Sequence, residues 1–306
     1  MNRYRSIILS ALFALAIVLG LLAFLDSQDS LKQISQLPLS IWITLLLITT
    51  VHLILRFYRW CLLLFASFEV QVISKIELCA LYVSGFALTL VPSKLGENVR
   101  SIFLKERGVP YSASITVFFI ERFLDVAAVS LLALAYFAPA RAVNMTQALL
   151  SLVGALVAAT IVLQWMPLTF FSHPRLEQIK LALISLRSIS TTTRVEVLVL
   201  SFLAWWIQSL SLWIVLYALS EPVSVIVTSA IYSMSLLAGA VSMMPGGLGV
   251  TELTAAYSLE QSGVEFNSAL LAMTITRFTT LWYAMFLGII GYSYCTKKAH
   301  LSVGQG

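Results

Sequence analysis

The chain has 306 residues, of which 59% are hydrophobic and 11% are charged, with a formal net charge of +5, and its mean hydropathy is +0.93. A water-soluble domain cannot enclose that much apolar surface, so the composition excludes a soluble globular protein and indicates a polytopic membrane protein. The Lys and Arg residues are spread over many short connections and form no single stripe, which argues against nucleic acid as a partner.

Six apolar runs are long enough to cross a hydrocarbon core about 30 Å thick, which takes roughly 20 helical residues. In chain order they cover residues 7–25, 39–57, 114–138, 145–166, 195–219 and 267–292. The first run is longer than the apolar core of a secretory signal peptide, and no small-residue cleavage site follows it. We therefore expect it to be retained as a transmembrane helix.

Two more apolar segments, residues 76–104 and 223–260, each contain a helix-breaking element near the middle. The first break is Pro-Ser-Lys-Leu-Gly-Glu at residues 92–97, and the second is Pro-Gly-Gly-Leu-Gly at residues 245–249. Irregular backbone survives at membrane depth only where it is buried in protein or lines a wet cavity. We expect each segment to bend back or unwind inside the helix bundle.

The two breaks belong to a longer repeated pattern. Each is followed by a Gly-Val pair, at 108–109 and 263–264, and then by an Arg-Phe pair inside the next apolar run. Three crossings separate the broken segments, so we expect inverted-topology repeat halves of roughly 67–140 and 220–292. Paired interrupted segments of this kind are typical of transport sites near the bilayer midplane. Chance recurrence of short Pro/Gly motifs is the alternative.

The sequence thus predicts a single all-α membrane domain over residues 1–306, with six crossings and two broken or re-entrant segments. Basic residues of the connections fall almost entirely on one side if the N-terminus is cytoplasmic, which also places the C-terminus in the cytoplasm. The polar connection 169–194 has leucine and isoleucine at helical spacing. We expect an amphipathic helix on the cytoplasmic leaflet, and a solvated loop helix fits as well.

Ionisable residues inside an apolar run are the sharpest local signal. Glu121 and Asp125 are four residues apart and share a helical face, while Arg122 and Asp125 are three apart and can pair. Charged groups in a membrane span cost several kcal/mol unless they face the interior and find partners. Either a structural ion pair or a functional site accounts for them.

Arg277 occupies the same repeat position as Arg122 and has no acidic neighbour within one helical turn. Glu252 is one candidate partner, and an anionic ligand is the other. Guanidinium groups bind phosphate with forked, bidentate geometry, so Arg100, Arg122 and Arg277 together can cradle a phosphodiester headgroup. Glu121, Asp125 and Glu252 would then hold the arginines or change protonation.

The breaks themselves complete the expected binding site. Lys94, Gly96 and Glu97 come from the first break. If Gly246, Gly247 and Gly249 open the second helix, free N–H groups at the following helix start add to an anion site. Close packing between helices is the alternative explanation for these glycines.

His52, Arg56 and Arg59 lie near the expected cytoplasmic end of the second crossing, and Trp60 follows them. Snorkelling arginines and an interfacial tryptophan explain this group without a function. A lone histidine in a helix is more often hydrogen-bonded structure than a ligand. We therefore place these residues outside the expected site.

In chain order, these motifs resemble the lysylphosphatidylglycerol synthase transmembrane region family, also called flippase-like or uncharacterised membrane protein family 0104. The likeness covers essentially the whole chain and rests on Arg56-x-x-Arg59-Trp60, Pro92-x-x-x-Gly96-Glu97-x-x-Arg100, Glu121-Arg122-x-x-Asp125, the run from Pro245 to Glu252, and Arg277. One departure is Ser93-Lys94-Leu95, where an arginine or another basic residue is expected near the middle. Lys94 supplies the charge but not the forked geometry of a guanidinium group.

Similar members include the flippase half of the multiple peptide resistance factor, which moves aminoacylated phosphatidylglycerol, and relatives linked to hopanoid or polyprenyl-linked sugar pathways. The resemblance implies lipid translocation in a bacterial inner membrane. It implies no lysyl transfer, since this sequence holds no soluble aminoacyltransferase domain.

The favoured hypothesis is a transporter that moves an anionic phospholipid or polyprenyl-phosphate-linked lipid between leaflets. No P-loop is present, so transport would be passive or ion-coupled. One alternative is an intramembrane transferase with a lipid-phosphate donor and Glu97 or Asp125 as general base. Another is a non-catalytic scaffold that recruits a membrane-associated synthase or glycosyltransferase. We expect no enzymatic activity, no cofactor and no metal, and the three cysteines lack metal-ligand spacing.

Overall fold

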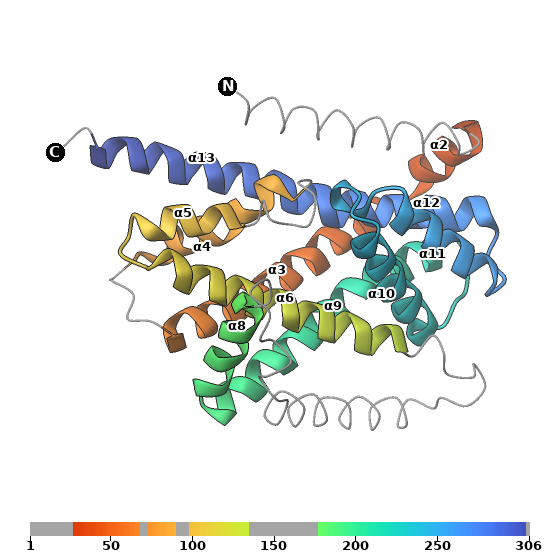
Figure 1. Ribbon diagram of the computed structural model, residues 1–306. Coiled ribbons are helices and arrows are strands. Elements are labelled where there is room, and N and C mark those ends of the chain that lie inside the picture. The colour runs from red at the N-terminus through yellow and green to blue at the C-terminus, as the bar shows by residue number, and fades with distance from the viewer. Residues whose placement is uncertain (1–26, 68–72, 90–97, 135–176, 304–306) are drawn as a thin grey trace.

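The computed structural model describes residues 27–67, 73–89, 98–134 and 177–303, and within these ranges every regular element is a helix (Figure 1). The predicted all-α membrane bundle is therefore confirmed. The predicted crossings 7–25 and 145–166 and the first break at 92–97 lie outside the described residues.

Two of the predicted crossings form long helices that pack side by side. The run 39–57 is the first part of α3 (Leu39–Ser67), and the run 195–219 forms α9 (Thr191–Ala218). Both are long and apolar enough to cross a membrane. The 29 residues of α3 extend about 43 Å at 1.5 Å per residue, well beyond a hydrocarbon core of about 30 Å. The short α2 (Ser27–Gln36) precedes α3.

The last predicted crossing, 267–292, is a continuous helical run. It begins with α12 (Phe266–Arg277), passes through a π-helical turn at Phe278–Trp282 and continues as α13 (Tyr283–Val303). A π-helical turn is rare and is frequently found at functional sites. This one directly follows Arg277, the arginine that the sequence singled out.

The crossing predicted at 114–138 is described as α6 (Tyr111–Leu134), which carries the three ionisable residues of the Glu121 to Asp125 motif. It packs against α9 and α10 (Val225–Val241). The connection 169–194 is described from α8 (Glu177–Ser188), which lies against α6. A helix in this connection is thus confirmed, while its position on the cytoplasmic leaflet stays a prediction.

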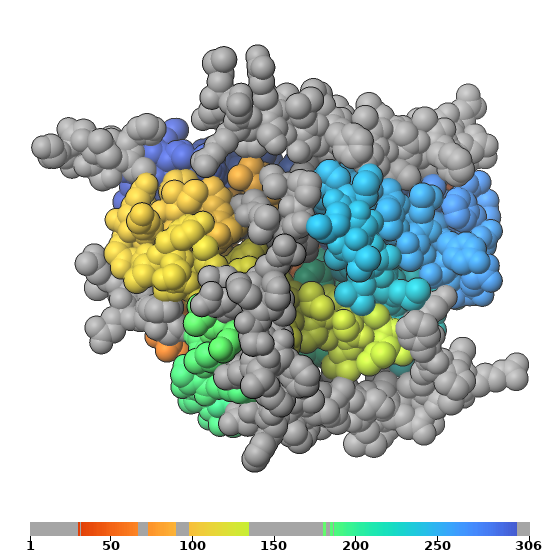
Figure 2. Space-filling view, in the orientation of Figure 1, coloured from red at the N-terminus to blue at the C-terminus, as the bar shows by residue number. Residues whose placement is uncertain are grey.

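Helical pieces flank both predicted breaks. The first segment contains α4 (Lys75–Ser84), a 3₁₀ turn η1 (Gly85–Leu88) and α5 (Val99–Lys105). The second contains α10, the short turn η6 (Pro245–Gly247) and α11 (Val250–Glu260). The break at 245–249 is confirmed. Figure 2 shows helices of the first segment (yellow) and of the second (cyan) on opposite sides of one face.

The repeated Gly-Val pairs have the same local structure in both halves. Gly108 has φ 82° and Gly263 has φ 93°. The following N–H groups close the same wide turn, from Val109 to Leu104 O at 3.2 Å and from Val264 to Leu259 O at 3.1 Å. This is a Schellman helix end, in which glycine adopts the left-handed conformation and the next apolar residue is buried. The two halves therefore share an element order, and their inverted topology stays a prediction.

Candidate functional site

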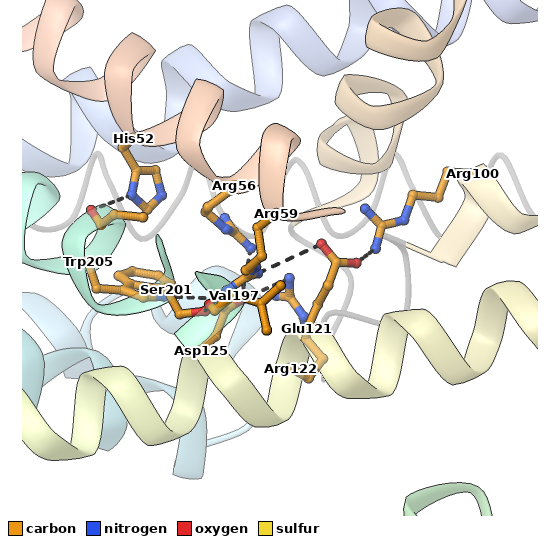
Figure 3. A network of polar contacts seen from close by, with 11 residues as sticks. His52, Arg56, Arg59, Arg100, Glu121, Arg122, Asp125, Val197, Ser201 and Trp205 are labelled. Carbon is orange, nitrogen blue, oxygen red and sulfur yellow. Dashed lines mark hydrogen bonds and ion pairs between the residues drawn. The ribbon is translucent and has the colours of Figure 1, made fainter. Parts of the chain in front are cut away.

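A network of charged side chains is buried where α3, α5, α6 and α9 meet (Figure 3). Glu121 and Asp125 come from α6, and both are buried, with exposed fractions of 0% and 5%. Four arginines surround these two carboxylates: Arg56 and Arg59 from α3, Arg100 from α5 and Arg122 from α6.

Asp125 is the centre of the network. Its Oδ1 accepts hydrogen bonds from Arg59 Nη1 at 2.7 Å and from Trp205 Nε1 at 3.0 Å. Its Oδ2 accepts from Arg56 Nη2 at 2.9 Å and lies 3.0 Å from Arg122 Nη2. The predicted pairing of Arg122 with Asp125 is confirmed. Both oxygens therefore have two nitrogen partners, so the carboxylate is fully engaged.

Glu121 extends the network to α5. Its Oε2 accepts a hydrogen bond from Arg100 Nη2, and its Oε1 lies 3.8 Å from Arg59 Nη2. Arg59 thus lies between the two carboxylates, and its Nη1 also donates to Ser201 Oγ at 2.7 Å. Glu121, Arg59 and Asp125 form one continuous network from α5 to α9.

The expectation that Arg56 and Arg59 snorkel at the membrane boundary is wrong. Arg59 has an exposed fraction of 0% and Arg56 of 5%, and Trp60 is also buried. The physical reason is the length of α3, which continues to Ser67 instead of ending near residue 57. One feature of the sequence could have predicted this. The predicted crossing carries two carboxylates but only one arginine, so a further cation had to come from another helix.

His52 lies beside the network and not in it, as the sequence predicted. Its Nδ1 is 2.8 Å from Ala204 O, and its ring meets Trp205 edge-on with centroids 5.1 Å apart. The first contact joins α3 to α9, and the second packs the imidazole against the indole of Trp205, which donates to Asp125.

Aromatic rings stack on the buried arginines. The Arg100 guanidinium lies 5.4 Å from the Trp60 ring and 5.6 Å from the Tyr82 ring. Arg56 lies 5.6 Å from the Phe86 ring. Such contacts replace part of the lost hydration of a cation, at roughly 0.5–2 kcal/mol each. They supply no formal negative charge, so they do not neutralise the network.

Arg277 forms a second, separate group with Glu252. Its Nε donates to Glu252 Oε1 at 3.0 Å, and its Nη2 donates to the carbonyl of Gly246. Glu252 Oε2 accepts from the N–H of Gly249 at 2.6 Å. Glu252 is therefore the partner of Arg277, as the sequence suggested. Together they fasten the second break to α12.

Gly247 of the second break serves close packing, which the sequence left as the alternative. Gly247 has φ +68°, and a Cβ there would lie 3.1 Å from the Cα of Gly239. A Cβ on Gly239 would lie 2.0 Å from Thr251 Oγ1. Two of the glycine N–H groups are engaged within the break, because Gly247 donates to Met244 O and Gly249 donates to Glu252 Oε2. The anion site expected at the start of α11 stays a prediction.

The predicted site residues thus separate into three sets. Arg100, Arg122, Glu121 and Asp125 share the network on α3, α5, α6 and α9. Arg277, Glu252 and the 245–249 glycines form the second group, and no hydrogen bond or ion pair between described residues joins it to the first. Lys94, Gly96 and Glu97 lie outside the described residues.

The sequence did not anticipate a third charged group at the end of α13. Glu77 at the start of α4 accepts from Arg107 Nε at 2.6 Å and from Lys298 Nζ at 2.5 Å. This group joins α4 to α13. In the part of the chain that the structure describes, no group of three or more His, Cys, Asp or Glu side chains could hold a metal ion.

Comparisons with known proteins agree with the geometry of a membrane bundle. The family described as the lysylphosphatidylglycerol synthase TM region matches residues 8–288. A protein of Methanocaldococcus jannaschii described as a UPF0104 membrane protein is 26% identical over 215 residues, which cover 67% of this chain and 92% of that relative. The matched family range includes the buried network and the second break.

Proposed function

This chain belongs to the lysylphosphatidylglycerol synthase transmembrane region family, and on that basis we propose that it moves an anionic, phosphate-bearing lipid between the two leaflets of a membrane. The chain is a multi-pass membrane protein, and its family name points to lipid handling. The observation that carries the proposal is the network of two buried carboxylates and four arginines, of which Arg122 alone is partly exposed.

The size of the network argues against a purely structural role. A charged side chain at the bilayer centre costs about 2.5–3.5 kcal/mol on insertion scales, and a single ion pair suffices to join two helices. Here six charged side chains are gathered, and their arginines come from three different helices. Guanidinium forks suit phosphate oxygens, so an anionic headgroup offers a reason to keep this many cations in one place.

Each part of the network has a role in this proposal. Arg59, Arg100 and Arg122 bind the phosphate while the acyl or prenyl chains stay in the bilayer. Glu121 and Asp125 hold the guanidinium groups in position between substrates. Arg277 and Glu252 fix the second break, which shapes the path instead of contacting the phosphate. Transport is passive or coupled to an ion gradient, and the protein has no catalytic activity of its own. We place it in the cell inner membrane with both termini in the cytoplasm.

The test is a flipping assay in proteoliposomes. Vesicles carry an acyl-labelled anionic lipid, and a membrane-impermeant quencher reports how fast the label leaves the inner leaflet. We expect the wild type to exceed protein-free vesicles clearly, and Arg100→Gln to lose about tenfold or more, because a charge-assisted contact is worth roughly 1.5–3 kcal/mol.

Arg107→Gln is the matched control, since Arg107 lies in the separate Glu77 group. It should flip lipid at the wild-type rate. Wild-type rates equal to those of protein-free vesicles, with correctly folded protein, would remove the proposal.

The contacts give the transferase alternative little support. A general base needs a free oxygen lone pair at the reacting group, and both oxygens of Asp125 are already held by Arg56, Arg59, Arg122 and Trp205. Detection of a covalently changed lipid would favour that reading. Co-purification with a synthase or glycosyltransferase, without lipid movement, would favour a scaffold.

A further inference from the structure

Tyr82 on α4 is a buried tyrosine whose hydroxyl has no assigned role. Its exposed fraction is 2%, and its ring packs against those of Phe57, Trp60 and Phe86, with centroids 5.4 or 5.5 Å apart. The hydroxyl oxygen is buried and makes no hydrogen bond with a described residue. A buried tyrosine O–H usually has a hydrogen-bond partner. The ring is therefore explained by packing, and the hydroxyl is not.

The Tyr82 side chain lies against the charged network. The Arg100 guanidinium is 5.6 Å from the centre of its ring, and the same guanidinium donates to Glu121 Oε2. The charges of Glu121 and Arg59 also act on the Tyr82 hydroxyl. Tyr82 thus reaches the network from α4, a helix that contributes none of the charged residues of the network.

Two neighbouring side chains of the network also have buried polar atoms that are not hydrogen-bonded. Arg59 is fully buried, and its Nε and Nη2 donate no hydrogen bond to a described residue. Glu121 Oε1 accepts none, and it lies 3.8 Å from Arg59 Nη2 (Figure 3). Folded proteins bury few such atoms. Their presence on Arg59, Glu121 and Tyr82, which come from three helices, indicates that a further polar group binds between them.

We propose that the Tyr82 hydroxyl contacts the headgroup of the transported lipid, where it and Arg59 donate hydrogen bonds to a phosphate oxygen. This inference rests on the proposed function and adds a binding residue that is not among its arginines. Tyr82 supplies an O–H donor, and Arg59 supplies N–H donors at Nε and Nη2. Because 3.8 Å is too long for a hydrogen bond, Glu121 Oε1 attracts Arg59 Nη2 without using its donor.

The test is the variant Tyr82→Phe, which removes the hydroxyl and keeps the ring. Flipping of acyl-labelled phosphatidylglycerol is measured in proteoliposomes over a range of mole fractions of that lipid. We expect the half-saturating mole fraction to rise about tenfold, because a hydrogen bond to a charged group is worth about that factor or more. The rate at saturation should stay near the wild-type value, since the contact is already made in the bound state.

Tyr283→Phe is the matched control. The Tyr283 hydroxyl lies 3.1 Å from Thr50 Oγ1, so it has a hydrogen-bond partner within the protein. Its removal should leave the half-saturating mole fraction unchanged and lower the unfolding midpoint. Tyr82→Phe should show the opposite pattern, with an unfolding midpoint equal to or above that of the wild type, because burial of an unbonded hydroxyl is unfavourable.

The outcomes separate this inference from the function on which it rests. If the wild type flips lipid and Tyr82→Phe has the same half-saturating mole fraction, the Tyr82 contact is overturned and lipid transport stands. A Tyr82→Phe protein that fails to fold, or unfolds earlier than the wild type, would show that the hydroxyl is structural and would also overturn the contact. A wild type that flips no lipid would overturn both. Entry of radiolabelled inorganic phosphate without lipid movement would overturn the lipid as the ligand and assign the site to the free anion.

Discussion

Asp125 and its asparagine variant differ by one charge at nearly the same volume. The carboxylate has nitrogen partners at 2.7, 2.9 and 3.0 Å on three arginines, besides the indole of Trp205. In Asp125→Asn, one carboxylate oxygen becomes an NH₂ group, which donates and cannot accept. In either orientation of the amide, the donors that faced that oxygen then face another donor.

The expected loss of stability follows from this geometry. Removing one partner of a buried ion pair costs about 3–5 kcal/mol, because the remaining charge is left uncompensated. Here three guanidinium groups lie within 3.0 Å of the carboxylate, and all three would lose its negative charge. Folded domains have a total free energy of unfolding of only about 5–15 kcal/mol. We expect Asp125→Asn to lose about a fifth or more of the free energy of unfolding.

The assay is an unfolding titration with a denaturing detergent in mixed micelles, followed by tryptophan fluorescence. Glu260→Gln is the matched control, since Glu260 is exposed at the end of α11. Neutralising it should change the free energy of unfolding by no more than about 0.5 kcal/mol.

A double-mutant cycle identifies the cause of the loss. Adding Arg56→Gln to Asp125→Asn removes one positive charge as well as one negative charge, so the net charge of the network returns to its original value. If uncompensated charge causes the loss, the double variant should lose less free energy of unfolding than the sum of the two single losses, by roughly 0.5–3 kcal/mol. An Asp125→Asn protein as stable as the wild type, or strictly additive effects in the cycle, would refute the reasoning.

Two further predictions concern the second break. Glu252→Gln should lower the free energy of unfolding by about 3 kcal/mol or more, because it leaves the buried Arg277 without its counter-charge, and an unchanged midpoint in the same titration would contradict this. Gly247→Ala should cost more than Gly263→Ala. Both glycines have positive φ, for which a Cβ costs roughly 1–2 kcal/mol. A Cβ at Gly247 also meets Gly239 at 3.1 Å, whereas Gly263 has nothing within 4 Å. Equal losses would show that close packing at Gly247 is unimportant.

Features that depend on neighbours in the chain could be predicted from the sequence. Apolar runs determined the membrane class, because the cost of exposing them to water does not depend on how the helices are arranged. The Arg122 and Asp125 pair followed from a spacing of three residues on one helix. The Pro-Gly break and the Gly-Val turns followed from the conformations that these residues allow.

The composition of the site was decided by tertiary structure. Arg56 and Arg59 entered the network because α3 continues past the expected membrane boundary and packs beside α9 and α6. Arg277 lies away from Arg122, although the two share a repeat position, because its guanidinium is held by Glu252 and Gly246. Spacing along one helix fixes which side chains share a face, but a charge on that face pairs with whichever helix the packing brings to it.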